Sequence, residues 1–236
     1  MRVFELSTRM KAVSRGDGRS ATAAAAYRAC CVIECEREGR THDYSRKHGL
    51  ELAAIVLPEG APAWARDRAR LWNAAELAER NGKRGRNANA FKADAQVARD
   101  YLFTFPAELS AAGRRAVAYA VARHLVETHG VAADFAIHAP GKEGDQRNWH
   151  CHLMTTTRRL TAKGLGEKAR EWDDLKSSRV LAKALRATVA RTLTEALAAE
   201  GKADAVRVEH LSFKDRGSPQ TPTQHMGPTK THILRK

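Results

Sequence analysis

Two segments with helical periodicity constrain the fold of this chain more than any other feature. Ser110 precedes a run whose apolar residues recur at helical spacing until Gly130, and a second such run covers about Ser178 to Glu200, before Gly201. The apolar positions are Val117, Val121, Leu125 and Val126 in the first run and Leu181, Leu185, Val189, Leu193 and Leu197 in the second. Both runs therefore predict amphipathic helices.

Short β-compatible runs are distributed around these helices. They cover residues 2–7, 32–36, 41–44, 50–57, 97–106, 134–138, 150–157 and 206–211. Ser20 is a good N-cap for a further helix over Ala21 to Cys31, and Ala61 to Arg80 also has a helical apolar stripe. Strands and helices mix without strict βαβ alternation, so we predict an α+β fold with a largely antiparallel sheet flanked by helices.

The charge of the chain favours a polyanionic partner. Its 236 residues include 41 Lys and Arg against 27 Asp and Glu, a formal net charge of +14. This excess makes nucleic acid the leading partner class, although a basic surface can also be merely solvated. No long uncharged apolar run and no leader with an apolar core is evident, so we expect a soluble cytoplasmic protein rather than one bound to membranes.

The four cysteines argue against a disulfide framework. They stand at positions 30, 31, 35 and 151 and form neither a CxxC pair nor an even spacing. We therefore expect no disulfide and no cysteine-based zinc site. The apolar content of 43% is enough for a sizeable core, and one domain is the simpler organisation.

A histidine pattern lies in two of the predicted strands, 134–138 and 150–157. On a strand, His150 and His152 share one face, whereas Cys151 turns to the other face. If the preceding strand pairs with this one antiparallel, His138 completes a set of three imidazoles with an open position, as in catalytic metal sites. Paired histidines on a half-exposed strand also occur by chance. Three imidazoles suit Mn, Zn, Ni or Co, whereas Mg usually prefers oxygen ligands.

Tyr27 lies in the helix that Ser20 begins, and by itself it would be an ordinary aromatic residue. In this region the sequence resembles the MobA/MobL conjugative relaxases of the MobQ class, from about Met1 to Pro228. The matching blocks are Arg15–Arg28, Ala136–Thr157 with its three histidines, Gly164–Glu171, and Arg207–Leu211 followed by His225–Pro228. Four blocks in the same order make the resemblance specific.

The resemblance implies a palm-like antiparallel sheet of the HUH relaxase type, beside which the tyrosine helix packs. Tyr27 matches the family's nucleophile, and His138, His150 and His152 match its metal ligands. Asp100 matches an acidic position on a strand, where it would orient a metal-bound histidine or accept the tyrosine proton. Related sequences often have Glu two residues later as well, where this chain has Leu.

The activity implied is nicking and rejoining of one DNA strand at a plasmid origin of transfer, through a 5′-phosphotyrosine. The cofactor would be a divalent metal, with Mn or Mg in function and Zn, Ni or Co compatible with three histidines. The partners would be single-stranded origin DNA and a type IV secretion coupling protein, and the protein would pass with the DNA into the recipient cell. Residues 1–228 would form the relaxase domain, and 229–236 a basic tail or linker.

Candidate DNA contacts flank the two motifs. Arg15, Arg19 and Arg28 lie near the tyrosine, and Arg147, Arg158 and Arg159 near the histidines; each could equally be solvated surface. Trp72 and Trp149 are candidate stacking groups, with core packing favoured for Trp72.

Three alternatives stay open at this point. The histidines could activate water in a metal-dependent nuclease, with a purely structural Tyr27. The chain could instead be a rolling-circle replication initiator, which uses the same chemistry, or a non-catalytic DNA-binding module with a structural ion.

Overall fold

The central sheet confirms the prediction of a largely antiparallel α+β fold. The computed structural model describes residues 1–81, 90–142 and 145–221. The strands of the sheet lie in the order β2 (Thr8–Ser14), β6 (Gln96–Thr104), β8 (His150–Thr161), β7 (Val131–His138) and β5 (Leu50–Val56), and β9 (Gly164–Lys168) pairs with the end of β8. Every neighbouring pair in this sheet is antiparallel.

Smaller elements complete the chain. Strand β1 (Arg2–Glu5) pairs in parallel with β10 (Val206–Glu209), and β3 (Val32–Cys35) forms a hairpin with β4 (Arg40–Asp43). The α-helices are α1 (Ala21–Ala29), α2 (Arg68–Leu77), α3 (Ala111–His129) and α4 (Leu175–Ala199), and short 3-10 turns cover Arg15–Asp17, Ala63–Arg66 and Arg170–Trp172. Within the described ranges, no helix is both long and apolar enough to cross a bilayer.

Capping residues explain where the helices begin and end. Ser20 accepts a hydrogen bond from the amide of Ala23 and begins α1, and Gly130 ends α3 in a left-handed conformation, both as predicted. Helix α2 begins at Arg68 rather than near Ala61, because Asp67 caps it. Helix α4 begins three residues before the predicted start, because Asp174 accepts two amide hydrogen bonds there.

Two strands escaped prediction. No strand was predicted over β2, whose residues, alternately half-buried and exposed along most of its length, pair with β6 at the sheet edge. Strand β9 is short, contains two glycines and depends on its pairing with β8. The predicted tail at 229–236 and the block His225–Pro228 lie outside the described residues.

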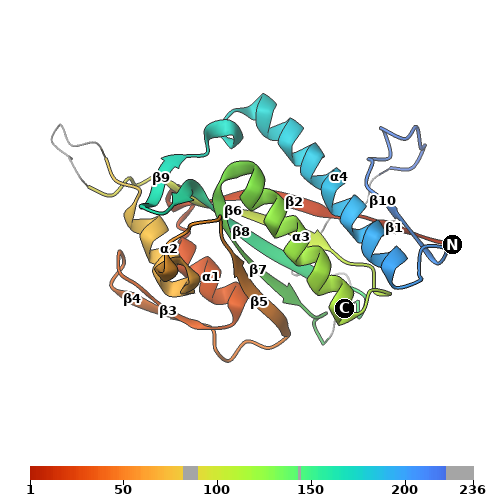
Figure 1. Cartoon of the computed structure of the whole chain (residues 1–236), viewed down its shortest axis with the longest axis horizontal. Helices are drawn as coiled ribbons and strands as arrows, with labels where there is room; N and C mark the ends of the chain where they lie inside the picture. Colours follow the sequence, from red (N-terminus) through yellow and green to blue (C-terminus); the bar gives the residue numbers. More distant parts are fainter. Residues whose placement is uncertain (82–89, 143–144, 222–236) are drawn as a thin grey trace, which may run out of the picture.

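The sheet separates two apolar cores (Figure 1). On one face, α3 and α4 pack on Phe103, Phe135 and Leu153. On the other, α1 and α2 pack on Ala98 and Met154. Side chains alternate along a strand, so residues an even number of positions from Met154 lie on the side of α1 and α2. His150 and His152 are such residues, which places them beside the helix that carries Tyr27.

Candidate active site

The pairing of β7 with β8 brings the three predicted histidines together. His138 lies directly opposite His150, and His152 opposite Ala136, in the antiparallel register. The ring centroids are 5.6 Å apart for His138 and His150, 5.6 Å for His138 and His152, and 5.3 Å for His150 and His152. Three imidazoles bound to one ion through nitrogens at ~2.1 Å in tetrahedral directions would have centroids roughly 5.3 Å apart. The spacing of the rings therefore fits a shared cation.

Hydrogen bonds fix two of these rings in metal-competent tautomers. A carbonyl oxygen can only accept, so His150 donates Nδ1–H to the Asn148 carbonyl at 2.9 Å, and His138 donates Nε2–H to the Arg28 carbonyl at 2.8 Å. Each ring keeps a lone pair on its other nitrogen. The Nδ1 atom of His152 is buried and has no hydrogen-bond partner.

Two of the three imidazoles, His138 and His152, are kept in the neutral form that metal ligation requires. Burial is the main cause that lowers the pKa of His138 to about 4 and the pKa of His152 to about 2, with positive charges such as Arg28 and Lys47 contributing. The donor nitrogens of the three rings are not all within 4.8 Å of one another. A bound cation would therefore require small ring movements.

The ring of Tyr27 lies at the surface, and Arg28 is the next residue of the same helix. Its exposed fraction is 46%, and its ring packs edge-on against Tyr44 with centroids 5.2 Å apart. The Nζ atom of Lys47 lies 4.0 Å from the centre of the Tyr27 ring and donates a hydrogen bond to the Tyr27 carbonyl at 3.2 Å. The phenol is thus accessible and has a cation beside it.

Two contacts link the tyrosine helix to the triad. The hydrogen bond from His138 reaches the carbonyl of Arg28, the residue after Tyr27. Lys47, which packs on Tyr27, also lowers the pKa of both His138 and His152 by its charge. Sequence reasoning missed Lys47. The signal available was the polar run from Tyr44 to Lys47 that follows the hairpin.

Asp100 contacts the arginine that follows Tyr27. Asp100 on β6 lies opposite Met154 on β8, and Leu102 on β6 lies opposite His152 on β8. Met154 shares its face of the sheet with His150 and His152, so Asp100 also lies on the face of the histidines. Its Oδ2 atom accepts a hydrogen bond from Arg28 Nη2 at 2.6 Å, and both side chains are about nine-tenths buried. The carboxylate therefore anchors α1 to the sheet through Arg28, a role that the sequence did not indicate.

Replacing Asp100 with asparagine is expected to destabilise the protein. The buried guanidinium of Arg28 would lose its countercharge, and breaking a buried pair costs about 3–5 kcal/mol. Urea denaturation measures the loss in the free energy of unfolding. Asp145→Asn is the matched control, because its pair with Arg147 is exposed and should contribute nothing measurable. A similar small effect for both variants would contradict the anchoring role.

The predicted DNA-binding arginines differ in their availability. Arg15 is turned inward, where it bonds Glu76 and the carbonyls of Glu79 and Lys92, so it is not available to a phosphate. Arg158 bonds Glu79 and the Gly166 carbonyl and is mostly buried. Arg159 pairs with Glu171. Arg147 is exposed but paired with Asp145 in the loop before His150.

Arg19 and Arg28, in contrast, border an open pocket. The pocket has a volume of about 690 Å³, and its lining includes Tyr27, Tyr44 and Arg40 together with these two arginines. Arg19 and Arg40 suit a phosphate backbone, whereas the Arg28 guanidinium is buried against Asp100.

The two tryptophans are less suited to stacking on bases. Trp72 is fully buried and donates Nε1–H to Asp134 at 2.8 Å, which confirms its place in the core. Trp149 is half-buried, and the guanidinium of Arg114 covers its ring at 3.6 Å.

Comparison with known proteins identifies relatives along almost the whole chain. A profile of the MobA/MobL family matches residues 19–236. The mobilization protein MobL of Acidithiobacillus ferridurans is 35% identical over 260 aligned residues, which include all of this chain and 65% of that protein. The chain therefore spans just under two thirds of this relative's length.

Solved structures share the fold. A structure described as the molecular basis of vancomycin resistance transfer in Staphylococcus aureus is 26% identical to this chain, with a TM-score of 0.72. The match includes 89% of this chain and the whole of the other chain. The conjugative relaxase TrwC, solved metal-bound in complex with oriT DNA, is 14% identical, with a TM-score of 0.53, and covers 97% of this chain and 90% of its own. The second likeness supports the fold alone.

Proposed function

Because the chain belongs to the MobA/MobL family, we propose that it nicks one strand of DNA at an origin of transfer, with Tyr27 as the nucleophile. The name of its relative MobL supports a role in mobilization, and a relaxase of the same fold was solved with origin DNA. The net charge of +14 and the arginines around the Tyr27 pocket agree with a DNA substrate.

One observation carries the proposal: the hydrogen bond from His138 to the carbonyl of Arg28. It joins the histidine triad to the helix residue next to Tyr27, although 110 positions separate the two partners in the sequence. This contact supports a site in which a phenol acts beside three imidazoles, a combination that suits phosphoryl transfer better than simple DNA binding.

In the proposed reaction the phenolic oxygen of Tyr27 forms a bond to the scissile phosphorus. The bond from phosphorus to the 3′ oxygen breaks, and that oxygen leaves as a hydroxyl after taking a proton from water. The phenolic proton passes to water, to which the exposed Tyr27 side chain has access. Lys47 stabilises the negative charge that develops on the phenol, since its ammonium lies against the ring. The phosphotyrosine keeps the energy of the broken linkage, so a 3′ hydroxyl can rejoin the strand.

His138, His150 and His152 would hold the divalent metal. When bound, such a cation neutralises the non-bridging oxygens of the phosphate and removes several kcal/mol of barrier. Neutral imidazoles suit Mn, Zn, Ni or Co, and Mg is the further candidate for the working ion. Asp100 and Arg28 position the tyrosine helix against this site.

The wider setting belongs to the same proposal. The partners would be single-stranded plasmid DNA at the origin and a type IV secretion coupling protein, with the protein acting in the cytoplasm and entering the recipient with the DNA. Residues 1–228 would form the nicking domain. Arg19 and Arg147 are the proposed DNA contacts among the predicted arginines, since Arg15, Arg28 and Arg158 are engaged internally.

A covalent-adduct assay tests this function. The protein is incubated with single-stranded origin DNA labelled at its 3′ end, with Mn²⁺ or Mg²⁺, and resolved on a denaturing gel. A nicked strand attached through its new 5′ end to Tyr27 carries the label into the protein band. A labelled product with a free 5′ phosphate would instead favour a nuclease that activates water. Binding without cleavage in any divalent ion would favour a DNA-binding module.

A further inference from the structure

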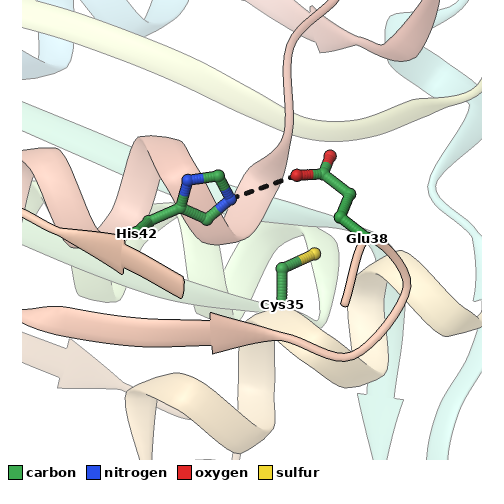
Figure 2. Close-up of side chains that lie close together, drawn as sticks. All are labelled: Cys35, Glu38 and His42. Atoms are coloured by element: carbon green, nitrogen blue, oxygen red, sulfur yellow. Dashed lines mark ion pairs between the residues drawn. The ribbon is translucent and has the colours of Figure 1, made fainter. Parts of the chain in front are cut away.

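A second cluster of metal-ligand side chains lies in the β3–β4 hairpin, distinct from the histidine triad. The sulfur of Cys35, a carboxylate oxygen of Glu38 and a ring nitrogen of His42 all lie within 4.8 Å of one another. Within residues 1–81, 90–142 and 145–221, no other set of three His, Cys, Asp or Glu residues meets this spacing. In Figure 2 the Cys35 side chain, from β3, points toward the ion pair of His42, from β4, and Glu38, from the turn of the same hairpin.

The hairpin geometry explains why these residues meet. Alternation along β3 turns Ile33 and Cys35 inward, and His42 on β4 lies opposite Ile33 on the same inner side. Glu38 lies in the turn, where Gly39 adopts a left-handed conformation with φ of 61°. The turn thus folds the carboxylate back toward the two inward side chains.

Two of the three donors are buried, and a nitrogen of one of them makes no hydrogen bond. Cys35 is fully buried and the exposed fraction of His42 is 7%. The Nε2 atom of His42 lies 3.2 Å from Glu38 Oε2, within ion-pair distance, but it makes no hydrogen bond. Buried polar atoms nearly always have a hydrogen-bond partner, so a nitrogen without one is suited to bind a ligand.

Contacts from α2 hold the hairpin in place around the cluster. Asn73 accepts a hydrogen bond from the amide of Glu36 at 2.9 Å and donates one to the carbonyl of Glu34 at 2.8 Å. Arg37, beside Glu38, donates to Glu76 on α2 at 2.9 Å. Arg37 also donates to the Glu38 carboxylate. These contacts hold the hairpin backbone around the three donors and support one donor, Glu38, directly.

We propose that Cys35, Glu38 and His42 bind one zinc-class divalent cation. Sulfur, carboxylate oxygen and imidazole nitrogen are the donors that Zn²⁺ takes, at ~2.0–2.3 Å in tetrahedral sites. Binding releases the thiol proton to water, and the thiolate and carboxylate together balance the two charges of the ion. Glu38 and His42 also line the Tyr27 pocket, so the fourth position would face that pocket and take a water molecule. The cation would fix the pocket wall beside Tyr27.

Cobalt titration tests this site without reference to nicking. Co²⁺ replaces Zn²⁺ in such sites and gives an intense near-ultraviolet absorption only when a thiolate is a ligand. Two or more equivalents of Co²⁺, enough to fill the triad as well as this site, are expected to produce this band in the wild-type protein, and added Zn²⁺ should remove it. The triad contains no sulfur, so its cobalt complex would not contribute.

Variants assign the band to its ligands. Cys35→Ser should abolish it, whereas Cys31→Ser, at a half-buried neighbouring thiol, and His150→Ala should keep it. Should Cys35→Ser fail to fold, Glu38→Gln in the turn provides a second test, with cobalt affinity expected to fall about tenfold or more. The proposal is overturned if the wild type gives no thiolate band, if the band survives in folded Cys35→Ser, or if Glu38→Gln binds cobalt as tightly as the wild type.

Discussion

Replacing Tyr27 with phenylalanine is expected to abolish the covalent protein–DNA adduct and to lower the nicking rate by about 10⁴-fold or more, as loss of a catalytic nucleophile does. The change removes only the hydroxyl. The ring contacts with Tyr44 and Lys47 remain, and so do the guanidinium groups that line the pocket. Affinity for single-stranded origin DNA should therefore stay within about threefold of the wild type, a shift below 1 kcal/mol. Single-turnover nicking and fluorescence anisotropy measure the two effects separately.

Tyr44→Phe is the matched control, because its phenol borders the same pocket and its ring touches that of Tyr27. This variant should form the adduct at a rate near that of the wild type. If Tyr27→Phe forms the adduct and Tyr44→Phe does not, the nucleophile is Tyr44, whose ring contacts that of Tyr27. If both variants nick DNA normally, neither phenol attacks the phosphate, and hydrolysis by activated water becomes the better account.

Local periodicity was sufficient to predict most of the fold. The alternation of a strand places His150 and His152 on one face and Cys151 on the other, where it is fully buried in the core of α3 and α4. The antiparallel pairing of two adjacent strands then brings His138 opposite His150. Both inferences need only the two-residue period and a neighbouring strand, which the sequence contains.

Contacts between distant side chains could not be predicted in this way. Arg28 was expected to touch DNA, and its guanidinium instead holds Asp100, 72 positions away, while its carbonyl holds His138. Arg15 is a basic residue beside the tyrosine motif, yet Glu76 on α2 draws it inward. Such pairings depend on which helix packs over which strand, and no local period encodes that choice.

The cysteine ligands also could not be predicted from local spacing. The spacing argues against a cysteine-based zinc site, because Cys35 has no second thiol at a suitable distance along the chain. A mixed donor set becomes visible only when the hairpin turn brings Glu38 and His42 to Cys35. The two clusters also differ in chemistry, since the triad offers nitrogen alone and the hairpin offers sulfur, oxygen and nitrogen. Metal measurements on this protein must therefore separate two sites.

Replacing His150 with alanine is expected to reduce nicking by at least about 10³-fold in every divalent ion, since a cation that supplies several kcal/mol of stabilisation would lose one of three ligands. His150 is the informative position. The His150 ring donates only to the neighbouring Asn148 carbonyl. His138 also holds α1 through the Arg28 carbonyl, so replacing His138 would disturb the helix that carries Tyr27. Nicking rates across a series of Mn²⁺, Mg²⁺, Co²⁺, Ni²⁺ and Zn²⁺ concentrations measure the loss.

His124→Ala is the control for this change, because it removes a half-buried imidazole from α3, on the other side of the sheet. It should leave both the nicking rate and its sensitivity to EDTA unchanged. DNA affinity compared in EDTA should be alike for His150→Ala and the wild type, since neither then holds a cation. Full nicking by the wild type in EDTA would show that no metal assists the attack. Full nicking by His150→Ala with metal present would remove this imidazole from the ligand set.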